Sequence, residues 1–501
     1  MVLEAQLSQS FQLPYDILLR IFTFYIKRLL TSGSSERTKP SEWLSFTHVC
    51  QYWRSAALES PTLWTEPDFR FPSIAHETLK RSQSLPISLT IRASEGAKLK
   101  ELAIEMLKSE YFPRIAYLEL CFSSPSALEA VLRVAVSPAS SLHTLRLEGG
   151  YYAGMVRVLL PDNFLGGTSV GLRQLEMVGF SIPWNSTFLR DLTHFDVKLP
   201  SPDLSVSQLC RILRRCPALE SLKLWNCLFT TGEDVAPVEL PRICDLFLGA
   251  SILVSIELLS ILKVPPSAVV RLSWEESEPS PADIDYLLRP LLVSSKIGKP
   301  TRDLMGLSFA WEVVEGFQFL TCLVFDEIPT LGNPSREFFA LTFHFRTFPP
   351  PNLGPYVHTF LEGAPISALR FLHFGNLSIL PLTARLVSTL PQLYNLDLDS
   401  TVQTCALLTQ AFGIQAEDGI AQRPYPFPSL STLRFYDVAF GSRPPASELE
   451  LRSLLIQHLS SRRAHGAAIE TLVLVSCKGF SEEDIRELKV HVGEVLEKKE
   501  P

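Results

Sequence analysis

One pattern constrains the fold more than any other feature of this chain. Six residues of the form apolar-x-x-apolar-x-apolar recur fourteen times, from "IAYLEL" at 115–120 through "LESLKL" at 219–224 to "IETLVL" at 469–474. Their spacing averages about 27 residues, a period typical of repeat proteins. Side chains of a strand alternate between two faces, so the last two apolar positions of each copy point the same way. Each copy therefore predicts one short strand.

Helical segments are predicted between these strands. Residues 126–136, 205–216 and 447–461 place apolar side chains at i, i+3 and i+4. Five copies also carry a proline two residues before the first apolar position, which favours one repeated register with the proline at the start of a strand; these are Pro113, Pro217, Pro241, Pro391 and Pro428. Each unit is predicted to run strand, loop, helix and return.

A single unit of this size buries too few apolar side chains to offset the entropy of ordering it, so the units must stack. The spacing resembles that of leucine-rich repeats. The expected fold class is α/β: a leucine-rich-repeat-like solenoid over 71–480, with a parallel sheet on its concave face and helices and loops on its convex face. Residues 481–501 are expected to be a C-terminal capping helix and tail, because Ser481 and Asp484 fit a helix start.

The residue between the last two apolar positions of each copy should face the concave side. These positions are Glu119, Arg146, Glu176, Asp196, Lys223, Phe247, Ser273, Ser308, Val324, Thr342, His373, Asp397, Arg434 and Val473. Trp225 should also face outward, beside Phe247, as an anchor for a bound protein. The predicted substrate-binding residues are Lys223, Trp225, Phe247, His373 and Arg434.

The first 70 residues lack this repeated pattern, and their sequence predicts a small helical unit. Pro14 suits the first turn of a helix, and Ile17, Leu18, Ile21 and Phe22 follow on one apolar face. A second helix is predicted from about Ser41 to Leu58, with Trp43, Phe46, Val49, Cys50, Trp53 and Ala57 on one face, before "SPTLW" at 60–64. A unit this small has a thin core and should lean on another surface. That surface is either a partner protein or the adjoining repeats, which the unit would then cap.

The blocks "LPYDILLRIF", "VCQYWRSAALESPTLW" and their order resemble the F-box motif, especially as found in mushroom-type fungi. The resemblance covers 11–70 and implies a small all-α domain that docks on the Skp-type linker of a cullin-containing ubiquitin ligase. Asp16 stands where the family usually has Glu. The residues that match, and that the resemblance assigns to linker binding, are Leu13, Pro14, Ile17, Leu18, Ile21, Phe22, Val49, Cys50, Trp53, Leu63 and Trp64.

Other partners and chemistries are not expected. The net charge is −7, with no basic stripe for nucleic acid. No segment is long and apolar enough to cross a membrane, and no secretory signal is visible, which favours a cytoplasmic or nuclear protein with reduced thiols. The nine cysteines form no CxxC pair, so no metal or other cofactor is expected. "GTSVG" at 167–171 would make Ser169 a nucleophile, but a strand follows it where the elbow of a hydrolase needs a helix.

The predicted function is that of a non-enzymatic substrate adaptor of a Skp/cullin/F-box ubiquitin ligase. The N-terminal domain would bind the linker while the repeats present a protein substrate, which raises the local concentration of that substrate. Three alternatives stay open. They are an interaction scaffold without ubiquitin transfer, a hydrolase that uses Ser169, and an unrelated solenoid with a helical cap in which Trp53 and Trp64 pack internally.

Overall fold

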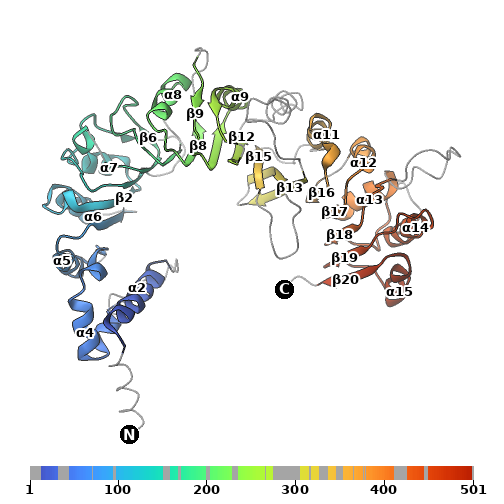
Figure 1. Cartoon of the computed structure of the whole chain (residues 1–501), viewed down its shortest axis with the longest axis horizontal. Coiled ribbons are helices and arrows are strands. Elements are labelled where there is room, and N and C mark those ends of the chain that lie inside the picture. Colours follow the sequence, from blue (N-terminus) through green and yellow to red (C-terminus); the bar gives the residue numbers. More distant parts are fainter. Residues whose placement is uncertain are drawn as a thin grey trace, which may run out of the picture. The chain divides into compact units, whose positions relative to one another are not determined.

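The protein is a mixed α/β chain in which a helical N-terminal region precedes a strand-rich region (Figure 1). The computed structural model describes residues 13–31, 44–69, 71–93, 97–149, 158–167, 171–198, 204–227, 235–265, 267–274, 305–314, 317–325, 337–345, 354–364, 366–375, 377, 380–410, 426–444 and 449–498. The chain divides into two compact units, Met1–Leu204 and Ser205–Pro501.

The first unit begins with short helices. They are α2 (Tyr15–Thr31), η1 (Ser45–His48), α4 (Gln51–Leu58), η2 (Pro61–Trp64) and α5 (Pro72–Arg81), where η marks a 3₁₀-helix. The single helix predicted over 41–58 is wrong, because Cys50 has an extended backbone (φ −158°, ψ 168°) that separates η1 from α4. The Cys50 sulfur accepts a hydrogen bond from the Trp53 amide at 3.5 Å and so caps α4. Ser41 and Trp43 lie outside the described residues.

Five parallel strands follow in the first unit. They are β1 (Ile87–Ala93), β2 (Ile115–Phe122), β3 (Thr144–Gly149), β5 (Gln174–Val178) and β7 (His194–Lys198), and they pair in that order. Some of these strands are connected by helices, which are α6 (Ala97–Lys108), α7 (Pro125–Leu132) and the 3₁₀-helices η3 (Phe112–Arg114) and η4 (Phe164–Gly167). A separate small pair consists of β4 (Val158–Leu159) and β6 (Phe180–Ser181).

The second unit holds a longer series. Its strands are β8 (Ser221–Cys227), β10 (Asp245–Ala250), β12 (Val269–Trp274), β13 (Gly306–Val314), β14 (Phe317–Phe325), β15 (Glu337–Phe345), β16 (Phe371–Gly375), β17 (Asn395–Leu398), β18 (Thr432–Tyr436), β19 (Thr471–Val475) and β20 (Glu494–Lys498). Its helices are α8 (Val206–Arg214), α9 (Ile252–Ile261), α11 (Gly354–Gly363), α12 (Pro381–Ser388), α13 (Thr401–Gln410), α14 (Leu451–Ala464) and α15 (Glu482–His491), with η6 (Ile366–Ala368) and the short pair β9 (Val238–Glu239) and β11 (Leu262–Lys263). Helices α11 to α15 lie on one face of β16–β20 (Figure 1).

The repeated pattern placed the strands correctly. All fourteen copies coincide with a strand, and the alternation buries one face, as with Leu222 and Leu224 of β8. None of the five prolines is the first residue of a strand: Pro113 lies in η3, and the other four lie in turns before their strands, as Pro217 does before β8. Ser205 starts α8 with a capping box that includes Gln208.

The expected all-parallel order fails in the middle of the second unit. The strand order there is β12-β15-β14-β13-β16, and β14 runs antiparallel to both β13 and β15. An antiparallel pair needs only a short turn, whereas a parallel pair needs a long crossover, and only residues 315–316 separate β13 from β14. Val324 of β14 is buried opposite Leu307, so its predicted position on the open face is wrong.

The register of β12 also differs from the prediction. Phe247 lies beside Arg271, whereas Ser273 pairs one step further along, with Gly249. The pattern misplaced the register because "VVRLSW" fits two alignments that differ by two residues, and both keep the same side chains inward. On the concave-facing side of the strands, Arg271 therefore occupies the position beside Phe247 that the sequence analysis assigned to Ser273.

The expected C-terminal capping helix is shorter than predicted. Helix α15 ends at His491, and β20 pairs parallel with β19, with Leu472 beside Val495 and Leu474 beside Glu497. The helix ends where Val492 takes an extended backbone (φ −122°, ψ 161°), and Gly493 follows because a Cβ there would lie 2.6 Å from the Glu470 carbonyl oxygen. The capping box between Ser481 and Asp484 is present as expected.

Candidate protein-interaction surfaces

Helix α2 contributes one face to a small hydrophobic core. Leu18 and Phe22 are buried there with Phe46. The Phe22 ring stacks on Phe46 with centroids 4.4 Å apart and meets Trp53 edge-on at 5.4 Å. These contacts hold α2 against η1 and α4, so this face belongs to the domain itself.

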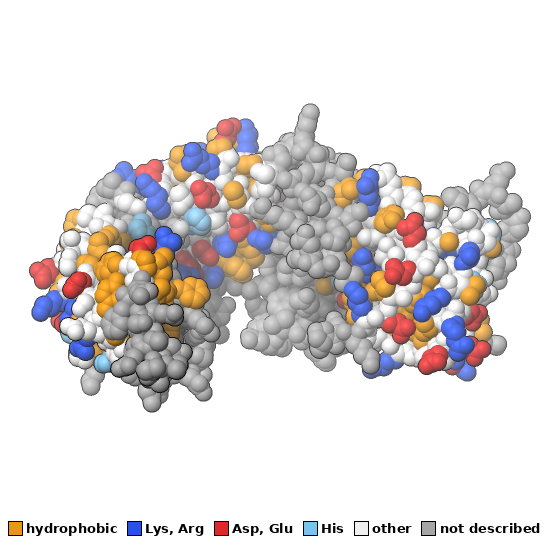
Figure 2. All heavy atoms as spheres, turned by 60° about the horizontal axis from the view of Figure 1, so that its bottom comes forward, with side chains coloured by type: hydrophobic (Ala, Val, Ile, Leu, Met, Phe, Trp, Pro, Cys, Tyr) orange, Lys and Arg blue, Asp and Glu red, His pale blue; other side chains and the backbone are white. Residues whose placement is uncertain are grey.

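A second apolar face of α2 is exposed. Ile17 is 37% exposed, Ile21 42% and Phe24 71%, and Pro14 and Tyr25 are exposed beside them. The spacing 14, 17, 21, 24 follows the i+3 and i+4 rule, so these side chains form one stripe along the helix. Val49, at the end of η1, is 48% exposed. Figure 2 shows hydrophobic side chains gathered at the N-terminal end of the molecule.

Trp64 anchors the other end of this helical region. Its indole N–H donates to the Ala57 carbonyl at 2.9 Å, and the Arg81 guanidinium lies 5.2 Å from its ring. The Ser88 amide, at the start of β1, donates to the Thr65 carbonyl at 2.9 Å. Trp64 and the neighbouring Thr65 therefore connect the helices to α5 and β1.

The structure divides the eleven residues that the resemblance assigned to linker binding. Those that are buried in the core are Leu18, Phe22, Leu63 and Trp64; those that are half-buried are Leu13, Cys50 and Trp53; and those that are exposed are Pro14, Ile17, Ile21 and Val49. The sequence interpretation missed Phe24 and Tyr25, although their spacing from Ile21 contained the signal.

Packing of Trp64 inside the chain is what the cap alternative requires. A cap, however, would also cover the apolar stripe of α2 with the chain's own residues, and that stripe is exposed. An exposed apolar stripe of this kind marks an interaction site. The open part of the α2 surface is therefore the leading candidate for contact with another protein.

In the first unit, the strand face opposite the buried one carries a ladder of charges. Arg92 and Glu119 form an ion pair at 2.6 Å, and the Tyr117 hydroxyl donates to Glu119 at 2.5 Å. Arg146 pairs with Glu176 at 2.5 Å on the next strands. Burial, and then the hydrogen bond to Glu119, raise the pKa of Tyr117, which keeps its hydroxyl protonated. This surface is polar, and its charges are matched by neighbours.

In the second unit, an aromatic pair lies beside charged groups. The Trp225 and Phe247 rings stack with centroids 3.8 Å apart, as the sequence predicted for their relative placement. Asp245 is 3.5 Å from the Lys223 ammonium and 2.5 Å from the Arg271 guanidinium. Both aromatic rings are half-buried. This cluster combines a flat apolar platform with hydrogen-bonding groups, a combination enriched at protein interfaces.

Further along the same unit, His373 and Arg434 are held by neighbouring carboxylates. Arg434 donates to both carboxylate oxygens of Asp397, at 3.1 and 3.2 Å. Burial raises the pKa of Asp397, while the positive charge of Arg434 acts in the opposite direction. His373 Nε2 lies 3.1 Å from an Asp399 oxygen, and its Nδ1 lies 2.8 Å from the Ser308 hydroxyl. The sequence placed Ser308, Asp397, His373 and Arg434 on this face but did not predict the contact with Asp399.

Ser308, His373 and Asp399 have the hydrogen-bond order of a hydrolytic triad, but their setting does not support acyl transfer. Ser308 lies within β13, whose backbone pairs with β14 on one side and with β16 on the other. The ladder therefore uses the amide groups that would have to stabilise an oxyanion. Ser169, the earlier candidate nucleophile, lies outside the described residues.

Other reactive groups give no stronger candidate. Burial raises the pKa of the Cys121 and Cys210 thiols to about 11, which leaves them protonated and weakly nucleophilic at neutral pH. Among the described residues, no cluster of His, Cys, Asp and Glu could hold a metal ion. None of the described helices is both long and apolar enough to span a bilayer.

Comparison with known proteins identifies one domain. A family model described as F-box-like matches residues 11–70, the segment that contains α2, α4 and η2. A comparison with curated proteins finds no match. The chain therefore carries an F-box-like domain at its N-terminus, followed by a strand-rich α/β region.

Proposed function

We propose that this protein is a substrate adaptor of a Skp/cullin/F-box ubiquitin ligase. The observation that carries the proposal is the coincidence of an F-box-like domain with an exposed apolar stripe on its first helix. F-box domains bind Skp-type linkers, and a helix that lays its apolar face into a groove is a common mode of protein recognition. Ile17, Ile21 and Phe24, with Val49, are the proposed contacts.

The buried part of the motif has a supporting role in this proposal. Leu18 and Phe22 fix α2 on α4, Trp64 contacts Arg81 of α5, and the Thr65 carbonyl bonds to Ser88 of β1. The stripe is then presented on a rigid element rather than on a loose helix. Pre-ordering of this kind lowers the entropic cost of binding.

The strand-rich region is proposed to hold the substrate. Its regular parallel strands with intervening helices support a degenerate leucine-rich-repeat arrangement, interrupted by the antiparallel strands β13–β15. The Trp225–Phe247 platform with Lys223 and Arg271 is the best-formed candidate contact in the second unit. The protein would perform no chemistry itself and would act by raising the local concentration of its substrate near the ligase.

Co-purification tests the proposal. The tagged full-length chain should recover both a Skp-type linker and a cullin from cells, and the Ile17→Asp with Ile21→Asp variant should recover neither. Recovery of the linker without a cullin would favour the alternative of an interaction scaffold outside the ligase. Recovery of the cullin by the double variant would contradict the assignment of the α2 stripe.

A further inference from the structure

The C-terminal end of the second unit has an open sheet edge. In the described part of the chain, β20 pairs with β19 alone and stands last in the strand order. Glu494, Glu497 and Lys498 are exposed there. An edge strand presents backbone N–H and C=O groups that pair readily with another strand.

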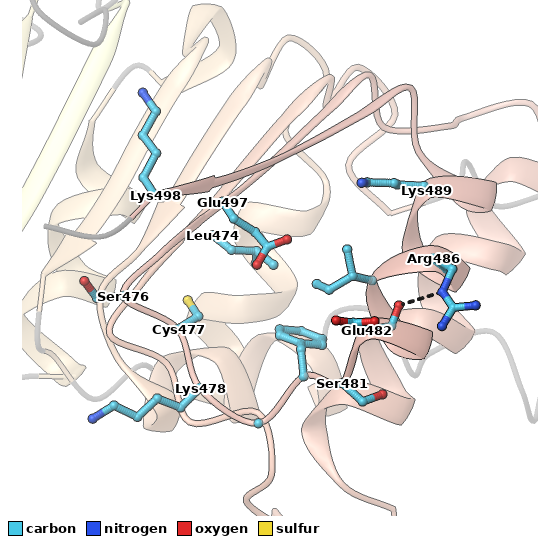
Figure 3. Close-up of a pocket in the computed structure, with 13 residues that line it drawn as sticks. Leu474, Ser476, Cys477, Lys478, Ser481, Glu482, Arg486, Lys489, Glu497 and Lys498 are labelled. Carbon is cyan, nitrogen blue, oxygen red and sulfur yellow. Dashed lines mark hydrogen bonds between the residues drawn. The ribbon is translucent and has the colours of Figure 1, made fainter.

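A groove runs between this strand and helix α15. It has a volume of about 1010 Å³ and is lined by Leu474, Phe480 and Ile485 with charged groups around them. Figure 3 shows Leu474 and Glu497 on the strand side and Glu482 and Arg486 on the helix across from them. Glu497 stands beside Leu474 in the register, in a row where Phe374, Leu398 and Phe435 are buried on the preceding strands, so β20 carries a charge on its inward face.

The sequence of β20 is complementary to itself in one antiparallel register. Glu494–Lys498 reads Glu-Val-Leu-Glu-Lys. If two copies pair about Leu496, each Glu494 faces Lys498 of the second copy and the two Leu496 side chains meet at the axis, while Val495 faces Glu497 on the other side of the strand. Opposite charges directly across an antiparallel pair are stabilising, and like charges are destabilising. A closed twofold contact of this kind uses the same patch on both copies.

Helix α15 is complementary to itself about the same axis. Its first turn is acidic, with Glu482, Glu483 and Asp484, and its last turn is basic, with Lys489 and His491. Helix α15 connects the parallel strands β19 and β20, so it runs antiparallel to β20. A twofold axis through Leu496 would set two α15 helices antiparallel on the same side of the joined sheet, with the acidic end of each toward the basic end of the other.

We propose that β20 and α15 form a homodimer interface, in which the β20 strands of two copies pair antiparallel about Leu496. The complementarity of the strand and that of the helix share one axis, which favours a second copy of this chain over an unrelated strand. This interface is independent of the proposed ligase function. It uses none of the α2 residues, and a dimer would carry two linker-binding domains.

A charge-swap experiment on the full-length chain tests the proposal by sedimentation velocity. The wild-type protein should be a dimer that dissociates on dilution. Lys498→Glu alone, or Glu494→Lys alone, places two like-charge pairs in the interface and should raise the dissociation constant about tenfold or more. An equimolar mixture of the two single variants should regain wild-type affinity, as should the chain that carries both changes.

Two controls separate this interface from others. Lys108→Glu, an exposed charge reversal at the end of α6 in the first unit, should leave the dimer unchanged, and so should Ile17→Asp with Ile21→Asp. The proposal is overturned if the wild-type chain stays monomeric at micromolar concentration. It is also overturned if the single variants dimerise as well as the wild type, or if their mixture does not restore association.

Discussion

Replacing Ile17 and Ile21 by aspartate should separate binding from folding in the N-terminal domain. Both side chains are partly exposed, at 37% and 42%, so the free chain loses little when they change. Exposed substitutions away from special features usually alter the free energy of unfolding by about 0.5 kcal/mol or less. The thermal unfolding of the double variant should therefore match that of the wild type.

The effect on binding should be large. Full burial of an isoleucine contributes about 1.5–3 kcal/mol, so covering the exposed parts of Ile17 and Ile21 contributes roughly 1–2.5 kcal/mol in total. Each aspartate left without a partner in the interface costs about 1–3 kcal/mol more. The sum is at least about 3 kcal/mol, which corresponds to a dissociation constant raised roughly 100-fold or more.

Calorimetric titration of the full-length chain with a purified Skp-type linker measures this change. A control is Thr23→Asp, which adds a carboxylate on the polar face of the same helix and should bind as the wild type does. By contrast, Phe22→Ala should lower the free energy of unfolding by about 3–5 kcal/mol, because Phe22 is buried against Phe46. Binding by the Ile17 and Ile21 variant within about threefold of the wild type would refute the reasoning.

Three further changes have defined outcomes. Arg462 is buried and donates hydrogen bonds to carbonyl groups of the turn at 426–430. Arg462→Met should therefore lower the free energy of unfolding by roughly 3 kcal/mol, measured by urea titration. An unchanged urea midpoint would contradict this. Hydrogen bonds from the Ser481 backbone lower the pKa of Asp484. The ionised Asp484 carboxylate therefore stabilises the folded chain above the ordinary pKa of 3.8, and this stabilisation is lost as the pH falls through the lower pKa that Asp484 has in the folded state. Asp484→Asn should therefore be less stable than the wild type at neutral pH and equal to it in strong acid; a gap that is independent of pH would oppose this. A fluorophosphonate probe should not label Ser308, because the neighbouring amides are held in the sheet, and labelling that depends on His373 would reverse that conclusion.

The strands were predictable because their signal is local. A six-residue pattern fixes which side chains are buried, and Leu222 and Leu224 lie inward as it requires. The same pattern carries no information on strand direction. The antiparallel course of β14 and the burial of Val324 could not be inferred from it.

The predicted helix boundaries were wrong where the backbone conformation of a single residue sets the start or end of a helix. Cys50 fits a helical face by spacing, yet its extended backbone and its sulfur cap begin α4 there. After α15, Val492 is extended and Gly493 fits beside the Glu470 carbonyl because it has no Cβ, a contact between segments distant in sequence. Apolar periodicity alone predicts neither of these two helix boundaries.

The candidate surfaces were predictable in part. The resemblance identified the N-terminal domain, but it did not distinguish its core from its open face, since Leu18 and Ile17 match the motif equally well. The contacts of His373 with Ser308 and Asp399 join strands separated by long stretches of chain, so they depend on a register that the sequence did not determine.

Photocrosslinking from Phe24 tests the central claim most directly. Among the side chains of α2 that the structure describes, Phe24 is the most exposed large apolar one, and benzoylphenylalanine replaces its ring conservatively. With the Skp-type linker added, a probe at Phe24 should crosslink to the linker, and a probe at the exposed Tyr394 in the second unit should not. A Phe24 probe that crosslinks only within its own chain would show that the stripe serves an internal contact and would contradict the account.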